Sequence, residues 1–140
     1  PMAAVRDREG YYSFHEYNWP DVGVAVSRDP KDGRLWGWHM LRFRRTYKAL
    51  RTAGHEPSET LLTEVGLDHL LYGVVEGWQG IDNNPRWYVF GQLARFDSWL
   101  QNNPLVKAAF VFTATAERTW RSYEMREADA EVLAEYMRST

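Results

Sequence analysis

Residues that could do chemistry come at the ends of three apolar or aromatic runs in this 140-residue chain. His15 and Tyr17 close the first run, Glu64 stands near the end of the second, and Trp120 follows the third. A glutamate at the last buried position of a strand is costly to bury unless it is paired, so Glu64 needs a partner or a function. Two interpretations are open: Glu64 is a catalytic carboxylate, or it pairs with one of the chain's many arginines.

Three strands are predicted to carry these residues. Residues 10–17 are rich in aromatics and end at an Asn-Trp-Pro turn. Residues 60–68 form a β-branched and apolar run that ends at a carboxylate and a glycine, which is typical of a buried parallel strand. Residues 105–113 are nearly all apolar, so we expect this strand to be covered on both faces.

Helices are predicted after each strand, because apolar residues recur at spacings of three and four over residues 39–53, 85–101 and 127–138. The segment 21–37 is expected to be a long exposed loop, and residues 1–9 the tail of an upstream helix or loop. We expect the basic side of the first helix to be solvated rather than to bind a ligand. Its basic residues are Arg42, Arg44, Arg45, Lys48 and Arg51.

The order strand, loop, helix therefore occurs three times, which predicts an α/β fold with parallel strands. Long loops bearing tryptophan follow the strands, whereas the connections from helix back to strand are short. This asymmetry is that of a (β/α)₈ TIM barrel, in which the loops after the strands build the site. A closed barrel needs eight units and about 250 residues. We therefore expect residues 1–140 to be a single segment, a partial (β/α)₈ TIM barrel of three consecutive βα units.

Strand alternation predicts which side chains meet at the barrel mouth. If Glu64 points into the mouth, Leu62 points there too, and Thr63 faces the helices. On the first strand His15 and Tyr17 share a face, and we expect them to converge with Glu64.

The order and even spacing of these strand-end residues form a pattern known from one enzyme family. The chain resembles the carboxy-terminal part of clan-A-type (β/α)₈ glycoside hydrolases, covering strands six to eight. The similarity runs from about Gly10 to Tyr123. It is carried by residues 14–17, residues 63–68, and residues 111–113 together with 120–123.

The resemblance implies retaining hydrolysis of O-glycosyl bonds in an oligo- or polysaccharide, with Glu64 as the nucleophile. His15 and Tyr17 would position Glu64 and the sugar, with Tyr17 donating a hydrogen bond to the carboxylate. Trp120 would be the aromatic platform under the sugar ring, and Trp78 a further substrate-binding residue. Alternatively, these tryptophans cover helix ends and loop cores. No cofactor is implied, because two carboxylates suffice for this chemistry.

The second carboxyl group is where the chain departs from the family. The family's acid/base glutamate lies at the end of strand four, upstream of anything present here, so we expect no activity from this chain alone. Glu16 is a possible substitute, but it should point away from the mouth, because its neighbours His15 and Tyr17 take the inward face. A metal site built from Asp68, His69 and Glu64 is disfavoured, since no second histidine stands at helical spacing.

Two other functions remain open. The chain could be a non-catalytic carbohydrate-binding module or pseudoenzyme that uses its aromatic loops without an acid/base. It could also be a structural partial barrel that self-associates, since three parallel strands expose two edges and part of an apolar interior. If the chain is instead the carboxy-terminal part of a glycoside hydrolase, we expect it to join a missing amino-terminal barrel portion.

Composition excludes several classes of protein. Seventeen basic residues against 19 acidic ones argue against nucleic acid as the main partner. No apolar run approaches the roughly 20 residues that span a bilayer. The absence of cysteine excludes disulfides, thiolate zinc sites and a cysteine nucleophile. The resemblance to polysaccharide-degrading enzymes suggests an extracellular or cell-envelope location, but the compartment, the sugar and the linkage stay open.

Overall fold

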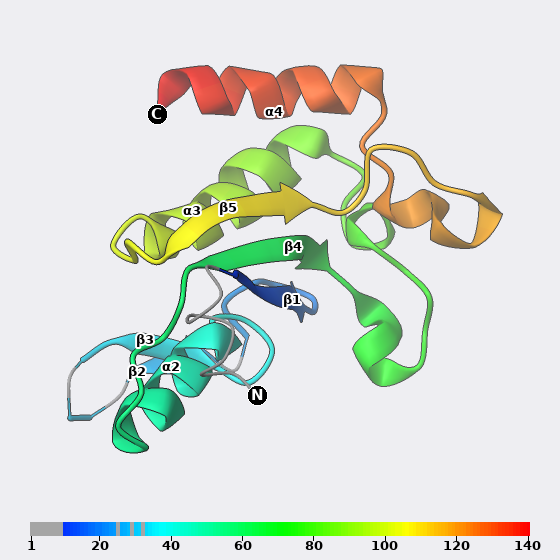
Figure 1. Ribbon diagram of the computed structural model, residues 1–140. Helices are drawn as coiled ribbons and strands as arrows, with labels where there is room; N and C mark the ends of the chain where they lie inside the picture. Colours follow the sequence, from blue (N-terminus) through cyan, green and yellow to red (C-terminus); the bar gives the residue numbers. More distant parts are fainter. Residues whose placement is uncertain (1–9, 25, 29, 32) are drawn as a thin grey trace.

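The computed structural model describes residues 10–24, 26–28, 30–31 and 33–140. The described residues have an α/β fold built on a three-stranded parallel sheet with strand order β1-β4-β5 (Figure 1). Its strands are β1 (Tyr12–Asn18), β4 (Thr60–Leu67) and β5 (Val106–Val111). Three parallel strands separated by helices were predicted, and this is confirmed. The sheet is open, and no pairing joins β1 to β5 within the described chain. The expected upstream tail, residues 1–9, lies outside the described residues.

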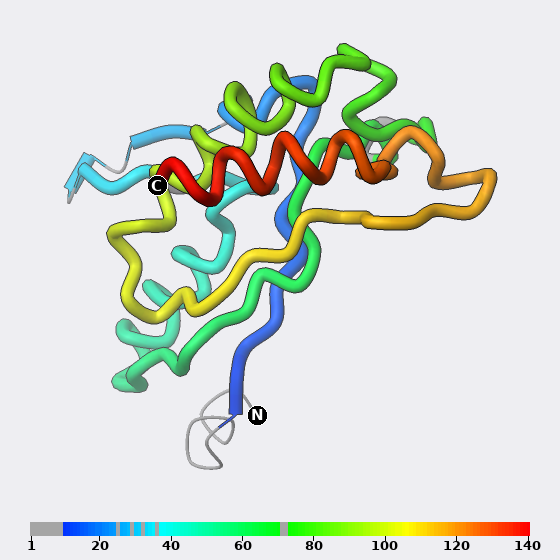
Figure 2. Tube along the Cα trace, turned by 90° about the horizontal axis from the view of Figure 1, so that it is seen from above, coloured from blue at the N-terminus to red at the C-terminus, as the bar shows by residue number. Residues whose placement is uncertain are grey.

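Two helical segments lie on one face of this sheet, and the last helix packs against one of them. The helices are α2 (Arg42–Thr52), η3 (Trp87–Leu93), which continues directly into α3 (Ala94–Leu100), and α4 (Glu127–Ser139). Figure 2 shows α2 and α3 on the same side of the strands. The three predicted helices are confirmed, although η3 has π-helical hydrogen bonding. No helix formed by the described residues combines the length and the apolar character needed to cross a membrane.

The helix-covered face holds the core. Burial follows the predicted stripes, and Phe43, Tyr47 and Leu50 of α2 are buried. From the sheet, Leu62 and Val65 of β4 pack into the same cluster. Burying such side chains supplies most of the driving force for folding, so this face fixes the sheet that carries the strand-end residues.

The segment predicted as a long loop, residues 21–37, contains an antiparallel hairpin, so that prediction is wrong in part. Strand β2 (Val26–Arg28) pairs with β3 (Leu35–Gly37). Arg44 of α2 fixes the hairpin by donating a hydrogen bond to the Leu35 carbonyl at 2.5 Å. Strands of three residues are too short to show a period of two, and Asp-Pro and Asp-Gly between them dominate the local signal.

Strand β5 is less buried than predicted. We expected cover on both faces, but every residue of the strand is partly or largely exposed, and Phe110 is 53% exposed. The reason is topological: β5 is an edge strand, and no described element covers its second face. Val106 and Val111 pack against the core from the other side.

The loops that follow β4 and β5 are joined to each other. They contain the short helices η1 (His69–Tyr72), η2 (Trp78–Gly80) and η4 (Arg118–Tyr123). The Gly77 N–H donates to Ser122 Oγ at 2.9 Å, and Gln79 Nε2 donates to the Glu124 carbonyl at 2.8 Å. A Cβ at position 77 would lie 2.7 Å from the Ser122 carbonyl oxygen, so only glycine allows this close approach.

Candidate functional site

A β-bulge in β4 determines where Glu64 points. The pairing of β4 with β1 shifts by one residue between Leu62 and Glu64, so Thr63 is an extra residue in β4. The consecutive side chains of Thr63 and Glu64 therefore lie on the same face of the sheet, the one opposite the helices, which we call the open face. The Thr63 hydroxyl lies 2.7 Å from that of Ser13, and Glu64 contacts residues of β1 on the same face.

The bulge corrects the pattern expected from strict alternation. Leu62 was predicted to share the face of Glu64, but it is fully buried in the core under the helices. Thr63 was predicted to face the helices, but it lies on the open face. After the bulge the alternation resumes, and Val65 is buried on the helix side. Glu64 reaches the open face because of the extra residue.

On the open face, His15 and Tyr17 of β1 meet Glu64. Tyr17 Oη donates a hydrogen bond to Glu64 Oε2 at 2.8 Å, and His15 Nδ1 lies 3.2 Å from the same oxygen. The Glu64 side chain is 34% exposed and that of His15 is 51% exposed, so solvent reaches both. The predicted convergence of these three side chains is confirmed, whereas their roles stay predictions.

The surroundings of Tyr17 favour its neutral hydroxyl, which can donate a hydrogen bond. Burial raises the pKa of Tyr17 far above its usual value, and the hydrogen bond to Glu64 and the charges of Glu64 and Asp68 raise it further. Both effects favour the neutral phenol, because a phenolate would be poorly solvated and would face two carboxylates. The carboxylate of Glu64 is thus held by a fixed donor.

An aromatic cluster connects Trp120 to this group. Phe112, directly after β5, meets Tyr17 edge-on with ring centroids 6.2 Å apart, and it meets Trp120 at 6.0 Å. Trp120 also packs against Tyr123 at 5.3 Å and is 36% exposed. Trp120 is therefore linked to Glu64 through Phe112 and Tyr17. Sequence analysis gave Phe112 no role, although its place at the carboxyl end of the third strand was the available signal.

Further polar contacts lie in the loops beside the cluster. Tyr123 Oη donates to Asp68 Oδ1 at 2.5 Å, and burial followed by this contact raises the pKa of Tyr123. The imidazole of His69 stacks on Trp19 with centroids 4.2 Å apart, and its Nδ1 lies 3.2 Å from Glu76 Oε2. Within the described chain, no three of its His, Asp and Glu side chains form a group that could hold a metal ion.

Trp78 does not belong to this site. It has no exposed surface, stacks on Tyr88 with centroids 4.9 Å apart, and donates from Nε1 to the Tyr123 carbonyl at 3.2 Å. The expectation that Trp78 binds substrate is therefore wrong in this structure. The alternative interpretation, a tryptophan that fills a loop core, is the one the structure supports.

Glu16 lies on the opposite face of the sheet from Glu64. Its carboxylate accepts hydrogen bonds from the backbone N–H groups of Arg42 at 3.2 Å and Phe43 at 3.3 Å, at the first turn of α2. Burial raises the pKa of Glu16 from 4.5 to about 7, although these hydrogen bonds and the charge of Arg42 lower it. Glu16 points away from Glu64, as expected, and its position excludes it as the acid/base partner.

Comparisons of the chain with models of protein families, with characterised proteins and with solved structures found no match. The class that the structure defines is an α/β fold with an open three-stranded parallel sheet. The resemblance to glycoside hydrolases stays a prediction, to be weighed on the geometry around Glu64.

Proposed function

We propose that the open face of the β1-β4-β5 sheet is part of a retaining glycoside hydrolase site, with Glu64 as the nucleophile. The arrangement of Tyr17, His15 and Glu64 carries this proposal. Both contacts are made to Oε2 of Glu64. They hold Oε2 in place and leave Oε1 available to attack an anomeric carbon.

The other interpretation of Glu64, a structural pair with arginine, has less support. Among the described residues His15 is the basic side chain that contacts Glu64, and no arginine is paired with Glu64. A partly exposed carboxylate that is held by a tyrosine and a histidine beside aromatic rings suits the binding of a sugar. The apolar face of a pyranose ring fits against an aromatic ring such as that of Trp120.

Hydrolysis by this route needs a second carboxyl group about 5–5.5 Å from the nucleophile. Glu64 Oε1 forms a bond to the anomeric carbon while the bond to the leaving oxygen breaks, and that oxygen takes a proton from the second carboxylic acid. Water then releases the sugar from Glu64, with the second carboxyl group acting as base. Since Glu16 lies on the other face, we propose that this group comes from another part of the enzyme.

We further propose that the three βα units belong to a (β/α)₈ barrel. The unpaired edges of β1 and β5 within the described chain support this proposal, because open edges favour pairing with further strands. The uncovered face of the sheet and the exposed Phe110 also support it. The partner is the amino-terminal barrel portion or, in a self-associating form, a second copy of the chain.

A reagent that needs no acid catalyst tests the nucleophile in this chain alone. Dinitrophenyl glycosides in which fluorine replaces the ring hydroxyl next to the anomeric carbon release dinitrophenolate without protonation and leave a long-lived glycosyl ester on the nucleophile. Reagents of gluco, manno, galacto and xylo configuration cover the unknown sugar. We expect one of them to add one glycosyl unit, measured by intact mass, with the ester mapped to Glu64.

Glu64→Gln is the matched control, because it keeps the shape of the side chain and removes the nucleophile. It should abolish labelling while oligosaccharide binding, followed by tryptophan fluorescence, persists. An ester at another carboxylate would contradict the proposal. Oligosaccharide binding without labelling by any reagent would favour the non-catalytic carbohydrate-binding module.

A further inference from the structure

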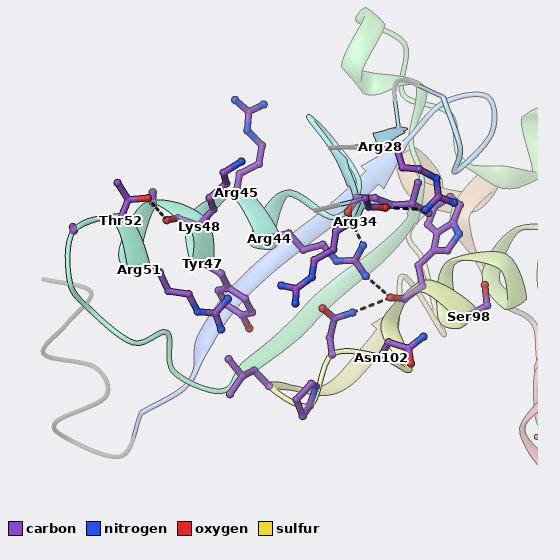
Figure 3. A pocket seen from close by; sticks show the side chains of 18 residues that line it. Arg28, Arg34, Arg44, Arg45, Tyr47, Lys48, Arg51, Thr52, Ser98 and Asn102 are labelled. Carbon is purple, nitrogen blue, oxygen red and sulfur yellow. Dashed lines mark hydrogen bonds between the residues drawn. The ribbon is translucent and has the colours of Figure 1, made fainter. Parts of the chain in front are cut away.

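A second concave region lies away from Glu64, at the amino-terminal ends of β4 and β5. It is a cavity of about 1170 Å³ between α2, the β2-β3 hairpin and the segment 98–105 that leads into β5 (Figure 3). Leu105 immediately precedes β5, and Tyr47 of the lining donates to Thr60, the first residue of β4, at 2.5 Å. The cavity is therefore separate from the strand ends that form the proposed hydrolase site.

The lining of this cavity is strongly basic. It includes six of the chain's 17 basic residues and, among the described residues, none of its 19 acidic ones. The six are Arg28, Arg34, Arg44, Arg45, Lys48 and Arg51. The described lining residues carry a formal charge of +6, against −2 for the whole chain, and Arg51 Nε lies 3.6 Å from Glu56 Oε2. A concave surface lined by one sign of charge focuses its field on the space inside.

These cations come from separate parts of the chain. Arg28 and Arg34 belong to the hairpin segment and the other four to α2. Figure 3 shows Arg34, Arg44 and Arg51 pointing into the space between α2 and the segment before β5, whereas Arg45 and Lys48 project from α2 away from it. A solvated helix face was expected, and it would spread its charges outwards. The hairpin, which sequence analysis did not predict, converts that face into one wall of a cavity.

Part of the cavity is held rigid. The guanidinium of Arg44 donates to the carbonyls of Leu35 and Trp99, which join the hairpin to α3. Arg28 Nη1 donates to the Gly33 carbonyl at 2.8 Å. Leu35, Trp99 and Leu105 supply apolar wall. Guanidinium groups fixed in this way lose little side-chain entropy when they bind an anion.

We propose that this cavity binds a small polyvalent anion that carries several phosphate or sulfate groups. The planar guanidinium forms paired hydrogen bonds to such oxyanions, and five of the six cations are arginines. A cavity of this volume exceeds what one oxyanion fills and is somewhat larger than most small-molecule sites. Several linked oxyanions suit a space of this size, which Arg34 enters from the hairpin segment and Arg44 and Arg51 enter from α2.

Titration calorimetry of the full chain with sodium tripolyphosphate tests the proposal at about 0.15 M salt, where distant surface charges are largely screened. We expect saturable binding to one site. Orthophosphate should bind at least about tenfold more weakly, because it meets fewer guanidinium groups. Sucrose octasulfate in place of tripolyphosphate distinguishes a sulfate from a phosphate preference.

The double variant Arg34→Gln/Arg51→Gln should raise the dissociation constant at least about tenfold, since it removes two charge-assisted contacts. Its matched control is Arg118→Gln/Arg121→Gln, which changes the net charge equally at exposed positions of η4 and should alter binding less than about twofold. Circular dichroism confirms that each variant is folded. Absence of saturable binding, equal losses in both variants, or tighter binding of a double-stranded DNA oligonucleotide than of tripolyphosphate would overturn the proposal.

Discussion

Glu16 and Glu64 lie on neighbouring strands, nearly side by side in the register, since His15 pairs with Glu64 and Glu16 with Val65. The side chain of Glu16 is 0% exposed and accepts two backbone N–H groups of α2, whereas that of Glu64 is 34% exposed and meets a tyrosine and a histidine. The same residue type thus stands in two opposite environments a few ångströms apart along one sheet.

The difference shows that the face of the sheet decides the environment of a carboxylate here. On the helix-covered face, Glu16 fixes the start of α2 and its burial makes the charged form costly. On the open face, Glu64 keeps contact with solvent and accepts a hydrogen bond from Tyr17, which suits the nucleophile that we propose. If this comparison is right, variants on the covered face change stability and variants on the open face change chemistry.

The bulge residue and the residue before it test the comparison with the largest expected effect. Leu62→Ala should destabilise the fold by about 4 kcal/mol, because it removes a fully buried side chain and leaves a cavity. Thr63→Ala, one residue further along β4, should cost less than about 1 kcal/mol, because that side chain lies on the open face. Denaturant unfolding measures both. Similar losses at the two positions would break the distinction between the faces.

The next largest expected effect is the pH dependence of stability that Glu16 causes. Its pKa in the folded protein, about 7, lies above the ordinary 4.5, so the folded state holds a proton that the unfolded state releases. The contribution of Glu16 to stability is therefore fully present below pH 4.5 and is lost as the pH rises through 7. The shift corresponds to about 3 kcal/mol across this window.

Glu16→Gln isolates that contribution, because glutamine fills the same space and still offers an oxygen to the N–H groups of α2. As the pH rises from 4.5 to 7.5, the unfolding free energy of the wild type should fall relative to that of Glu16→Gln, which has no carboxyl group to titrate at this position. Parallel pH profiles for the two proteins would show that Glu16 does not titrate in this window.

Much of the covered face could be predicted from the sequence. The spacing of Phe43, Tyr47 and Leu50 identified α2, and the apolar run of β4 identified the central strand, because burial imposes a period that the sequence must follow. The open face is under no such constraint. The bulge at Thr63 arises from pairing with both neighbouring strands, and no local pattern marks it.

The candidate site was predictable to a similar degree. The convergence of His15, Tyr17 and Glu64 was predicted from the order of the strands and from side-chain alternation. In the structure, the bulge in β4 is what turns Glu64 to the same face as the other two. The burial of Trp78 could not be predicted, because it depends on Tyr88, from a helix ten residues further on. Phe112 was missed because an apolar residue at a strand end carries no chemical signal until its neighbours are known.

On the open face, Tyr17→Phe tests the comparison by removing the hydrogen bond that Tyr17 donates to Glu64. Loss of the 2.8 Å hydrogen bond should leave Glu64 less well oriented and slow its labelling by a fluorinated dinitrophenyl glycoside about tenfold. The unfolding free energy should change by about 1 kcal/mol, the usual net value of one hydrogen bond. Kinetics of dinitrophenolate release gives the rate. Unchanged labelling with a large loss of stability would assign Tyr17 to the scaffold instead.

The smallest effect is expected when two hydroxyl pairs, one on each face of the sheet, are compared. Tyr47 Oη donates to Thr60 Oγ1 at 2.5 Å on the covered face, and Ser13 Oγ lies 2.7 Å from Thr63 Oγ1 on the open face. Tyr47→Phe should cost about 1 kcal/mol, because the buried Thr60 hydroxyl loses its donor where water cannot replace it. Ser13→Ala should cost at most about 0.5 kcal/mol, since solvent reaches the remaining Thr63 hydroxyl. If Ser13→Ala costs as much as Tyr47→Phe in denaturant unfolding, the open face is covered in solution, as it would be in a closed barrel or a self-associated form.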